Sequence, residues 1–328
     1  MGNYLKLIRI NNLIFILLIQ CMIQQFIIAP VLQINDIDNS NSLLYYILLV
    51  ATTILIAAGG YVLNDYFDVK IDTINKPDRL IIGRFISKEK AMFLYQVLTI
   101  CGIITGLILA WLLSSFTFAL IFIAVPGLLW FYSASYKRQL IIGNVIVAFL
   151  AGLSVFIVGM TEIALLQKQF GLLIFETGIP EHIYCWTGGF AFFAFLLTWI
   201  REIIKDIEDI RGDRELECRT LPIVWGITKA KTTIWILSGI TIALLVVTCI
   251  FLIPFEKSLT TKYLVYGIIL PFLLLFYLIF KAKDPYDYHQ ASALSKFIML
   301  MGLLYTFIVY YMLAKTYGIS MFNTFTVQ

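Results

Sequence analysis

The sequence predicts an all-α polytopic membrane protein with about nine transmembrane helices. Hydrophobic residues make up 61% of the 328 residues and the mean hydropathy is +0.91, whereas only 13% are charged. Soluble domains average about 25% charged residues, so the chain belongs to a bilayer. A spanning helix needs about 20 mostly apolar residues. The runs that qualify are roughly 12–34, 43–63, 92–113, 116–135, 140–163, 183–201, 232–253, 264–281 and 294–314.

The first run could be mistaken for a signal peptide, because Lys6 and Arg9 precede it. It is too long, and no small-residue cleavage site follows it, so we interpret it as the first spanning helix. The third and fourth runs divide at Ser114-Ser115. Five cysteines stand singly without a CxxC pair, which argues against a disulfide framework and a zinc site.

Lys and Arg placement predicts the orientation. With nine spans, the N-terminus and the segments 64–91, 136–139, 201–231 and 281–296 share one side, which carries 20 of the 24 basic residues. Positive charge marks the cytoplasmic face. We therefore expect the active site on the cytoplasmic side, and the absence of a cleavable transit peptide favours a prokaryotic inner (plasma) membrane over a plastid. The net charge of +4 reflects this asymmetry and indicates no nucleic-acid partner.

Two acidic clusters interrupt the apolar pattern. Windows 64–78 and 202–217 hold 11 of the 20 acidic residues, and they follow the second and the sixth span. This echo predicts two similar four-helix halves plus a ninth span, within a single domain of residues 1–328. The acidic ends of the halves would then face each other across a shared cavity. The sequence leaves the oligomeric state open.

The spacing of the acids predicts a metal site. Asn64, Asp68 and Asp72 recur at i, i+4 and i+8, so they share a face if the second span continues as a helix. Glu202, Asp206, Asp209 and Asp213 recur at i, i+4, i+7 and i+11, again one helical face. Such oxygen ligands suit Mg²⁺, which also binds substrate phosphates. Two solvated charged loop faces remain the alternative at this point.

Basic and polar residues accompany the acids, and Arg and Lys can bind phosphate oxygens. The positive-inside rule alone would place many of them here. They are Lys76, Arg79 and Arg84 after the first cluster, Tyr132, Ser133, Lys137, Arg138 and Asn144 around the short loop after the fourth span, and Arg201, Lys205 and Arg219 beside the second cluster.

These motifs resemble the UbiA-type intramembrane prenyltransferases. The first motif is Asn64-Asp65-x-x-Asp68-x-x-x-Asp72, followed by Asn75-Lys76-Pro77-Asp78-Arg79. The second is Asp209-x-x-x-Asp213, with Arg219-Thr220-Leu221-Pro222 after it. Tyr132-Ser133, Lys137-Arg138 and Asn144 match the signature between the two motifs.

The resemblance implies a Mg²⁺-dependent transfer of a prenyl group from an isoprenyl diphosphate to a lipid-soluble acceptor. It implies Asn64, Asp65, Asp68, Asp72, Asp209 and Asp213 as metal ligands. Asp68, Asp72, Asp206, Asp209 and Asp213 would be catalytic, and Lys76, Arg79, Tyr132, Lys137 and Arg138 would bind the diphosphate.

The acceptor is suggested by the run from Arg201 to Asp213, which is similar to members that prenylate the hydroxyl of geranylgeranylglyceryl phosphate. Aromatic quinone precursors and chlorophyllide-type acceptors remain alternatives. A cation-coupled transporter is an alternative of another class, although transport sites usually lie near the midplane. An inactive scaffold would more plausibly have lost some carboxylates.

The chain departs from the family pattern twice. Leu80-Ile81-Ile82 replaces a Pro and Ser common in the first loop, and Glu217 replaces a glycine after the second motif. Neither change removes an expected metal ligand, so we expect activity, and the two changes leave the substrate preference open.

Overall fold

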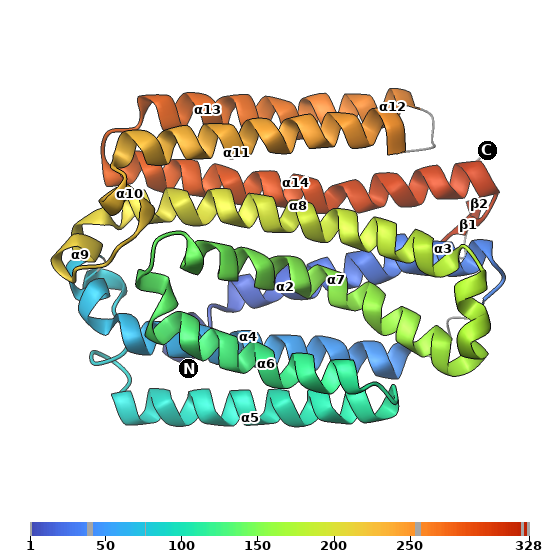
Figure 1. The fold of residues 1–328 in the computed structure, drawn as a ribbon, viewed down its shortest axis with the longest axis horizontal. Helices are drawn as coiled ribbons and strands as arrows, with labels where there is room; N and C mark the ends of the chain where they lie inside the picture. Colours follow the sequence, from blue (N-terminus) through green and yellow to red (C-terminus); the bar gives the residue numbers. More distant parts are fainter. Residues whose placement is uncertain (1, 38–41, 76, 253–256, 323–324, 327–328) are drawn as a thin grey trace.

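The structure, a computed structural model, describes residues 2–37, 42–75, 77–252, 257–322 and 325–326. Within these residues, nine helices are long and apolar enough to cross a membrane (Figure 1). The predicted all-α fold with nine spans is therefore confirmed. The spans are α2 (Ile10–Ile23) with η1 (Gln24–Ile28) and α3 (Ala29–Ile34), α4 (Leu43–Asn75), α5 (Lys88–Leu112), α6 (Phe116–Ala134), α7 (Ile142–Phe170) with η4 (Gly171–Glu176), α8 (Ile179–Glu208), α11 (Ile227–Val247) with η5 (Thr248–Leu252), α12 (Lys257–Tyr263) with η6 (Leu264–Ile269) and α13 (Leu270–Lys281), and α14 (Pro285–Tyr317).

Short elements connect or flank these spans. They are α1 (Gly2–Leu7), η2 (Pro77–Arg79), η3 (Tyr136–Arg138), α9 (Ile210–Glu215), α10 (Leu221–Val224) and the strands β1 (Ser320–Met321) and β2 (Phe325–Thr326). The two strands pair antiparallel after the last span. The predicted split at Ser114-Ser115 is confirmed, because α5 ends at Leu112 and α6 begins at Phe116.

Capping residues set where two of the spans begin. The Ser87 side chain accepts a hydrogen bond from the Lys90 amide at the start of α5. Asp284 and Asp287 form a capping box at the start of α14. Such side chains satisfy amides that lack an intrahelical partner, which fixes the first turn.

Close helix packing holds the bundle together at glycines. A Cβ atom added at Gly102 of α5 would lie 2.7 Å from the Ile56 side chain of α4. Gly159 of α7 is just as tight against Thr187 of α8. In a membrane, small residues let helix backbones approach where no water-driven hydrophobic force acts between helices. The close packing of α4 on α5 and of α7 on α8 therefore fixes the two helices, α4 and α8, that lead into the acidic motifs.

Both acidic motifs lie at one end of the bundle, at the left in Figure 1, where α9 lies; we call this the acidic end. The helix α4 continues to Asn75, so it carries the first motif on a regular helix, as the spacing predicts. The second motif departs from the expectation of a single helical face. α8 ends at Glu208, and Asp209 takes a non-helical conformation (φ −95°, ψ 9°) before α9 begins.

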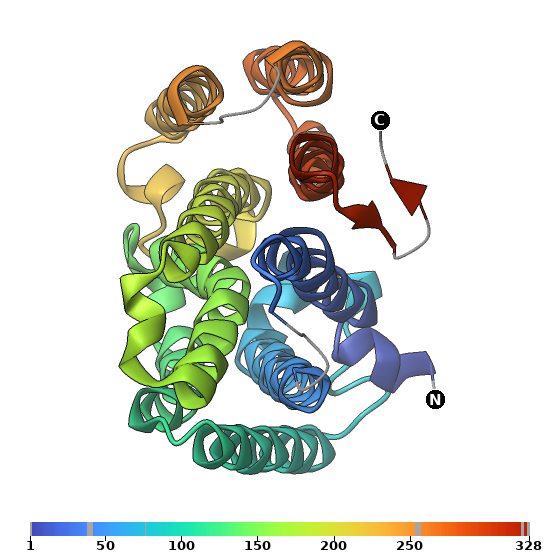
Figure 2. The same ribbon diagram turned by 90° about the vertical axis from the view of Figure 1, so that its right-hand side faces the viewer.

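Figure 2 views the bundle from the end opposite α9 and shows α11 and α13 outside the group formed by α2, α4, α7, α8 and α14. The acidic ends of the second and sixth spans do meet, because Asn75 of α4 hydrogen-bonds to residues of the second motif. The similarity of two four-helix halves and the extent of a single domain stay predictions.

Candidate active site

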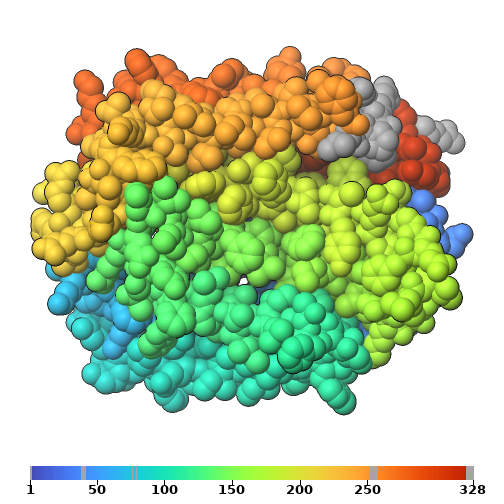
Figure 3. Space-filling view, in the orientation of Figure 1, coloured from blue at the N-terminus to red at the C-terminus, as the bar shows by residue number. Residues whose placement is uncertain are grey.

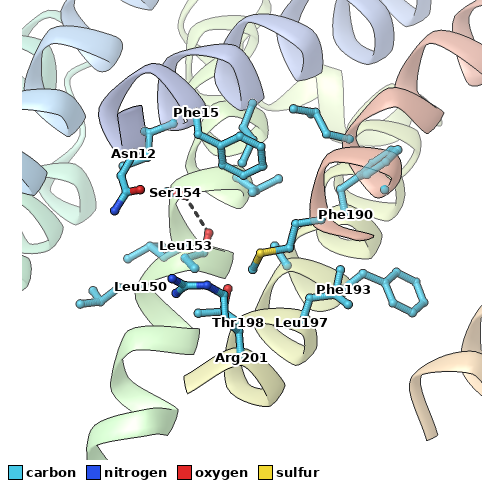
Figure 4. A pocket seen from close by; sticks show the side chains of 18 of the residues that line it. Asn12, Phe15, Leu150, Leu153, Ser154, Phe190, Phe193, Leu197, Thr198 and Arg201 are labelled. Atoms are coloured by element: carbon cyan, nitrogen blue, oxygen red, sulfur yellow. Dashed lines mark hydrogen bonds between the residues drawn. The ribbon is translucent and has the colours of Figure 1, made fainter. Parts of the chain in front are cut away.

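A cavity of about 1970 Å³ extends through the bundle from the acidic end. Asp68, Asp72 and Asp209 line it at that end, whereas His182 and Tyr317 line it near the opposite end. Its middle is mainly apolar. Figure 4 shows Phe15 of α2, Leu150 of α7 and Phe190, Phe193 and Leu197 of α8 around this part. On the face drawn in Figure 3, a small opening lies between α6 and α7.

The first motif presents its acids from one face of α4. The Nδ2 atom of Asn64 donates to Oδ2 of Asp68 at 2.8 Å. Asp68 is only 4% exposed and also pairs with the ammonium group of Lys137, which lies on η3. Burial opposes the charged form of Lys137, but the Asp68 carboxylate outweighs it and raises the pKa of Lys137 above its usual value.

Asp65 faces a different cation. Nη2 of Arg9 lies 2.7 Å from Oδ1 of Asp65, and the guanidinium stacks over the Tyr61 ring at 5.2 Å. Arg9 takes a left-handed backbone conformation (φ 53°) between α1 and α2, which turns the chain just before the first span. Burial favours the neutral form of Arg9, yet the Asp65 carboxylate raises its pKa. Arg9 therefore stays cationic on the cavity wall.

The second motif is fastened to the first by Asn75. Its Nδ2 donates to the Asp209 carbonyl at 2.9 Å, and its Oδ1 accepts from the Gly212 amide at 2.8 Å. A Cβ atom at Gly212 would lie 2.6 Å from Nδ2 of Asn75, so the approach requires glycine. This contact fixes Asp209 beside the end of α4.

Three of the expected site residues do not line the cavity. Asp206 accepts a hydrogen bond from Nδ2 of Asn144 at 2.8 Å and does not line the cavity. Asp213 is 7% exposed and also lies outside the lining. Arg138, likewise outside it, accepts a backbone hydrogen bond from the Arg219 amide at 2.8 Å. These residues support the wall.

The remaining expected residues divide as follows. Tyr132 lines the cavity together with Lys137. Lys76 lies outside the described residues, and Arg79 is described for its backbone in η2 only. Leu80 and Ile81, part of the departure from the family pattern, line the cavity. The first loop therefore covers the acidic end of the cavity with apolar side chains.

The donor set fits Mg²⁺ bound together with a diphosphate. Among the described residues, no three His, Cys, Asp or Glu side chains lie close enough to hold a metal ion on their own. Mg²⁺ usually takes one or two carboxylates and completes its octahedron with water and substrate phosphates. The Asp68, Asp72 and Asp209 carboxylates around one cavity suit that shared arrangement, and Asp68 is already paired with a cation.

Sequence reasoning missed part of the lining. Arg9, Asn12 and Tyr61 line the acidic half of the cavity, and so does Lys296 of α14. Lys296 was detectable as a lone cation inside the apolar run 294–314. Arg9 was detectable too, but its position directly before the first span also satisfies the positive-inside rule.

Comparison with known proteins gives consistent matches. Residues 37–304 match the model of the UbiA prenyltransferase family. A digeranylgeranylglyceryl phosphate synthase of Sulfurisphaera tokodaii is 32% identical over 252 residues, which are 77% of this chain and 80% of that protein. The synthase of the same name from Saccharolobus solfataricus is 35% identical over 256 residues, covering 76% and 81%.

Solved structures share the fold. One, from work on a digeranylgeranylglyceryl phosphate synthase in membranes, has a TM-score of 0.63 at 24% identity and covers 94% of this chain and 98% of its own. A UbiA homolog from Archaeoglobus fulgidus bound to GPP and Mg²⁺ has a TM-score of 0.56 at 16% identity, covering 93% and 99%.

Proposed function

The chain belongs to the UbiA prenyltransferase family, and from that premise we propose that it transfers a prenyl group from an isoprenyl diphosphate to the hydroxyl of geranylgeranylglyceryl phosphate. It is an integral membrane prenyltransferase by family and by its nine apolar spans within the described residues. The donor, the acceptor, the use of Mg²⁺ and the cytoplasmic position of the site are our proposals.

One observation carries the proposal: a single cavity joins a charged end to an apolar interior. Asp68, Asp72, Asp209 and Lys137 line the charged end, and helices α2, α7 and α8 supply apolar side chains beyond it (Figure 4). An isoprenyl diphosphate has the same two parts. Its diphosphate needs cations, and its hydrocarbon chain needs apolar surroundings.

The residues at the charged end have separate roles in this proposal. Asp68, Asp72 and Asp209 would hold Mg²⁺, with Asn64 orienting Asp68 through its 2.8 Å hydrogen bond. Mg²⁺, when bound, stabilises the charge that develops on the leaving diphosphate. Lys137 stays protonated beside Asp68 and adds a fixed positive charge. Tyr132 borders the same part of the cavity.

The proposed reaction replaces one carbon–oxygen bond with another. The bond between C1 of the prenyl group and the diphosphate oxygen breaks, and the diphosphate leaves with the bonding electrons. The acceptor hydroxyl oxygen then bonds to C1, and its proton passes to an oxygen of the released diphosphate. Asp206 is held by Asn144 outside the cavity lining, so we assign it a supporting role in place of direct proton transfer.

The acceptor is favoured by the relatives. Both synthases named above match this chain over more than three quarters of its length. Aromatic quinone precursors and chlorophyllide-type acceptors remain the competing substrates.

The test is a prenyl-transfer assay on purified protein in detergent micelles. Geranylgeranyl diphosphate is offered with geranylgeranylglyceryl phosphate, with an aromatic quinone precursor and with a chlorophyllide, each with and without Mg²⁺. We expect Mg²⁺-dependent product with the glyceryl phosphate. Product with only one of the other acceptors would contradict the proposed substrate, and no product with any acceptor would contradict the proposed donor as well.

A further inference from the structure

Four cations, from two spans and the segment before the first span, line the cavity within electrostatic range of one another. Arg9 precedes the first span, Arg201 and Lys205 lie on α8, and Lys296 lies on α14. All four line the cavity. Arg201 points among the lining side chains in Figure 4, next to Thr198 and Leu197.

The carboxylates in this group do not balance its positive charge. Glu202 is 8% exposed and accepts from Nη1 of Arg201 at 2.9 Å and from Nζ of Lys205 at 2.9 Å. Asp65 is paired with Arg9. Asp206 also lies within electrostatic range of Lys205. Four cations therefore face three carboxylates, so the positive charge of the group is not fully balanced.

Lys296 is the cation that the local acids do not reach. It forms no ion pair with another described residue, although it lies within electrostatic range of Arg9, Arg201 and Lys205 as well as of Glu202. Like charges that converge near a low-dielectric interior repel one another unless an anion offsets them. The arrangement is therefore most stable with an anion bound.

These cations are among those that the positive-inside rule places on one side, but the rule does not require them to line a cavity. Arg201 lies seven residues before the end of α8, and Lys296 is the twelfth residue of α14. At about 1.5 Å per residue they lie about 10 Å and 16 Å along their helices from the acidic end.

We propose that Arg201, Lys205 and Lys296 bind the phosphate group of the acceptor, with Arg9 at the border of this site. The inference rests on the proposed function and adds a recognition site to it. A phosphate monoester carries a charge of about −1.5 to −2 at pH 7, so it needs several cationic partners. The donor diphosphate would bind beside Asp68, Asp72, Asp209 and Lys137, which adjoin this group, because Arg9 lies within electrostatic range of both Asp68 and Lys137.

This assignment explains how one cavity could hold two anionic lipids. The headgroups bind to separate sets of cations, and both hydrocarbon chains extend into the apolar middle. It also gives a basis for selectivity, because an acceptor without a phosphate leaves the surplus charge unpaired. Rejection of such acceptors is expected, because a site built to bind a phosphate discriminates against an analogue that lacks it.

The experiment compares Lys296→Gln with wild type in a neutral detergent. Initial rates are measured with saturating geranylgeranyl diphosphate and two acceptors, geranylgeranylglyceryl phosphate and its dephosphorylated form, geranylgeranylglycerol. We expect the KM for the phosphorylated acceptor to rise about tenfold. The kcat/KM for geranylgeranylglycerol should stay the same. Lys296→Arg should restore the KM for the phosphorylated acceptor to near the wild-type value. Lys229→Gln, an exposed lysine of α11 that does not line the cavity, is the matched control.

Donor binding is measured separately with geranylgeranyl thiolodiphosphate and Mg²⁺, and we expect its Kd to be unchanged in Lys296→Gln. A parallel rise in that Kd would assign the cations to the donor diphosphate and overturn the inference. If Lys296→Gln lowers kcat/KM for geranylgeranylglycerol as much as for the phosphorylated acceptor, Lys296 has a structural role only, and the inference is overturned as well.

Two more outcomes separate this inference from the function on which it rests. If wild type prenylates geranylgeranylglyceryl phosphate and Lys296→Gln has the same KM for it, the proposed phosphate site is wrong and the proposed function stands. If phosphatidylglycerol inhibits wild type but not Lys296→Gln, while the acceptor KM is the same in both, the site binds a lipid headgroup instead. If wild type transfers nothing to the glyceryl phosphate, both proposals fall.

Discussion

Asn75 and Gly212 join the two acidic motifs across the bundle. The Gly212 amide donates to Oδ1 of Asn75 at 2.8 Å, and the two residues stand 137 positions apart in the sequence. Nδ2 of Asn75 also donates to the Asp209 carbonyl. The side chain at the end of α4 therefore fixes the backbone at the point where α8 gives way to α9.

Substituting Gly212 by Ala should separate the motifs. The new Cβ would lie 2.6 Å from Nδ2 of Asn75, so the amide must move and lose its hydrogen bonds, which costs about 1–3 kcal/mol. We expect prenyl transfer to fall about tenfold or more, with a lower thermal unfolding midpoint. Gly239→Ala in α11, where a Cβ meets nothing within 4 Å, is the control. Equal behaviour of the two variants would contradict the bridge.

Asp68 should be essential for transfer. Asp68→Asn keeps the size of the side chain but removes the charge that pairs with Lys137 and, in our proposal, holds Mg²⁺. We expect kcat/KM to fall on the order of 100-fold or more. Asp36→Asn is the matched control, because Asp36 is exposed near the opposite end and its left-handed backbone accepts Asn. Turnover near wild type in Asp68→Asn would exclude the proposed metal site.

Removing the divalent cation should abolish donor binding before it affects the fold. The Asp68, Asp72 and Asp209 carboxylates line the same end of the cavity and repel a diphosphate unless a cation bridges them. We expect EDTA to remove binding of geranylgeranyl thiolodiphosphate and Mg²⁺ to restore it, with the unfolding midpoint of the ligand-free protein nearly unchanged. Donor binding that ignores EDTA would argue against a metal-bridged diphosphate.

The Lys137 charge should persist through the usual assay range. Burial alone would lower the pKa of Lys137, but the Asp68 carboxylate raises it above 10.5. Because the folded pKa is the higher one, the stabilisation is fully present below pH 10.5 and is lost only as the pH rises through the folded value. We expect the unfolding midpoints of wild type and Lys137→Gln to differ by a constant amount between about pH 7 and 10. A difference that disappears below pH 10 would mean that the pair is not formed.

The orientation can be tested by cysteine labelling. Glu215→Cys at the acidic end and Leu172→Cys at the opposite end are both exposed. The background must lack the exposed Cys101 and Cys185. The Lys and Arg distribution predicts that an impermeant maleimide labels Glu215→Cys from the cytoplasmic side only. Labelling of Glu215→Cys from outside would reverse the predicted topology.

The sequence by itself determined the spans and the motif on α4. Run length and hydropathy are local properties, so nine spans could be counted, and a helix with acids at i, i+4 and i+8 keeps them on one face. The acids of the second motif were found for the same local reason. The prediction that these acids share one helical face was wrong, because the chain leaves the helix at Asp209 and is held there by the distant Asn75.

Only the tertiary structure decided which side chains reach the cavity. Asp206 and Lys205 are neighbours in sequence, yet Asp206 hydrogen-bonds to Asn144 outside the cavity lining while Lys205 lines the cavity. Lys296 joins Arg201 and Lys205 although they stand on different spans. Which face of a helix turns inward depends on how that helix is rotated against its neighbours. That rotation is set by packing between residues far apart in the chain, which no local pattern records.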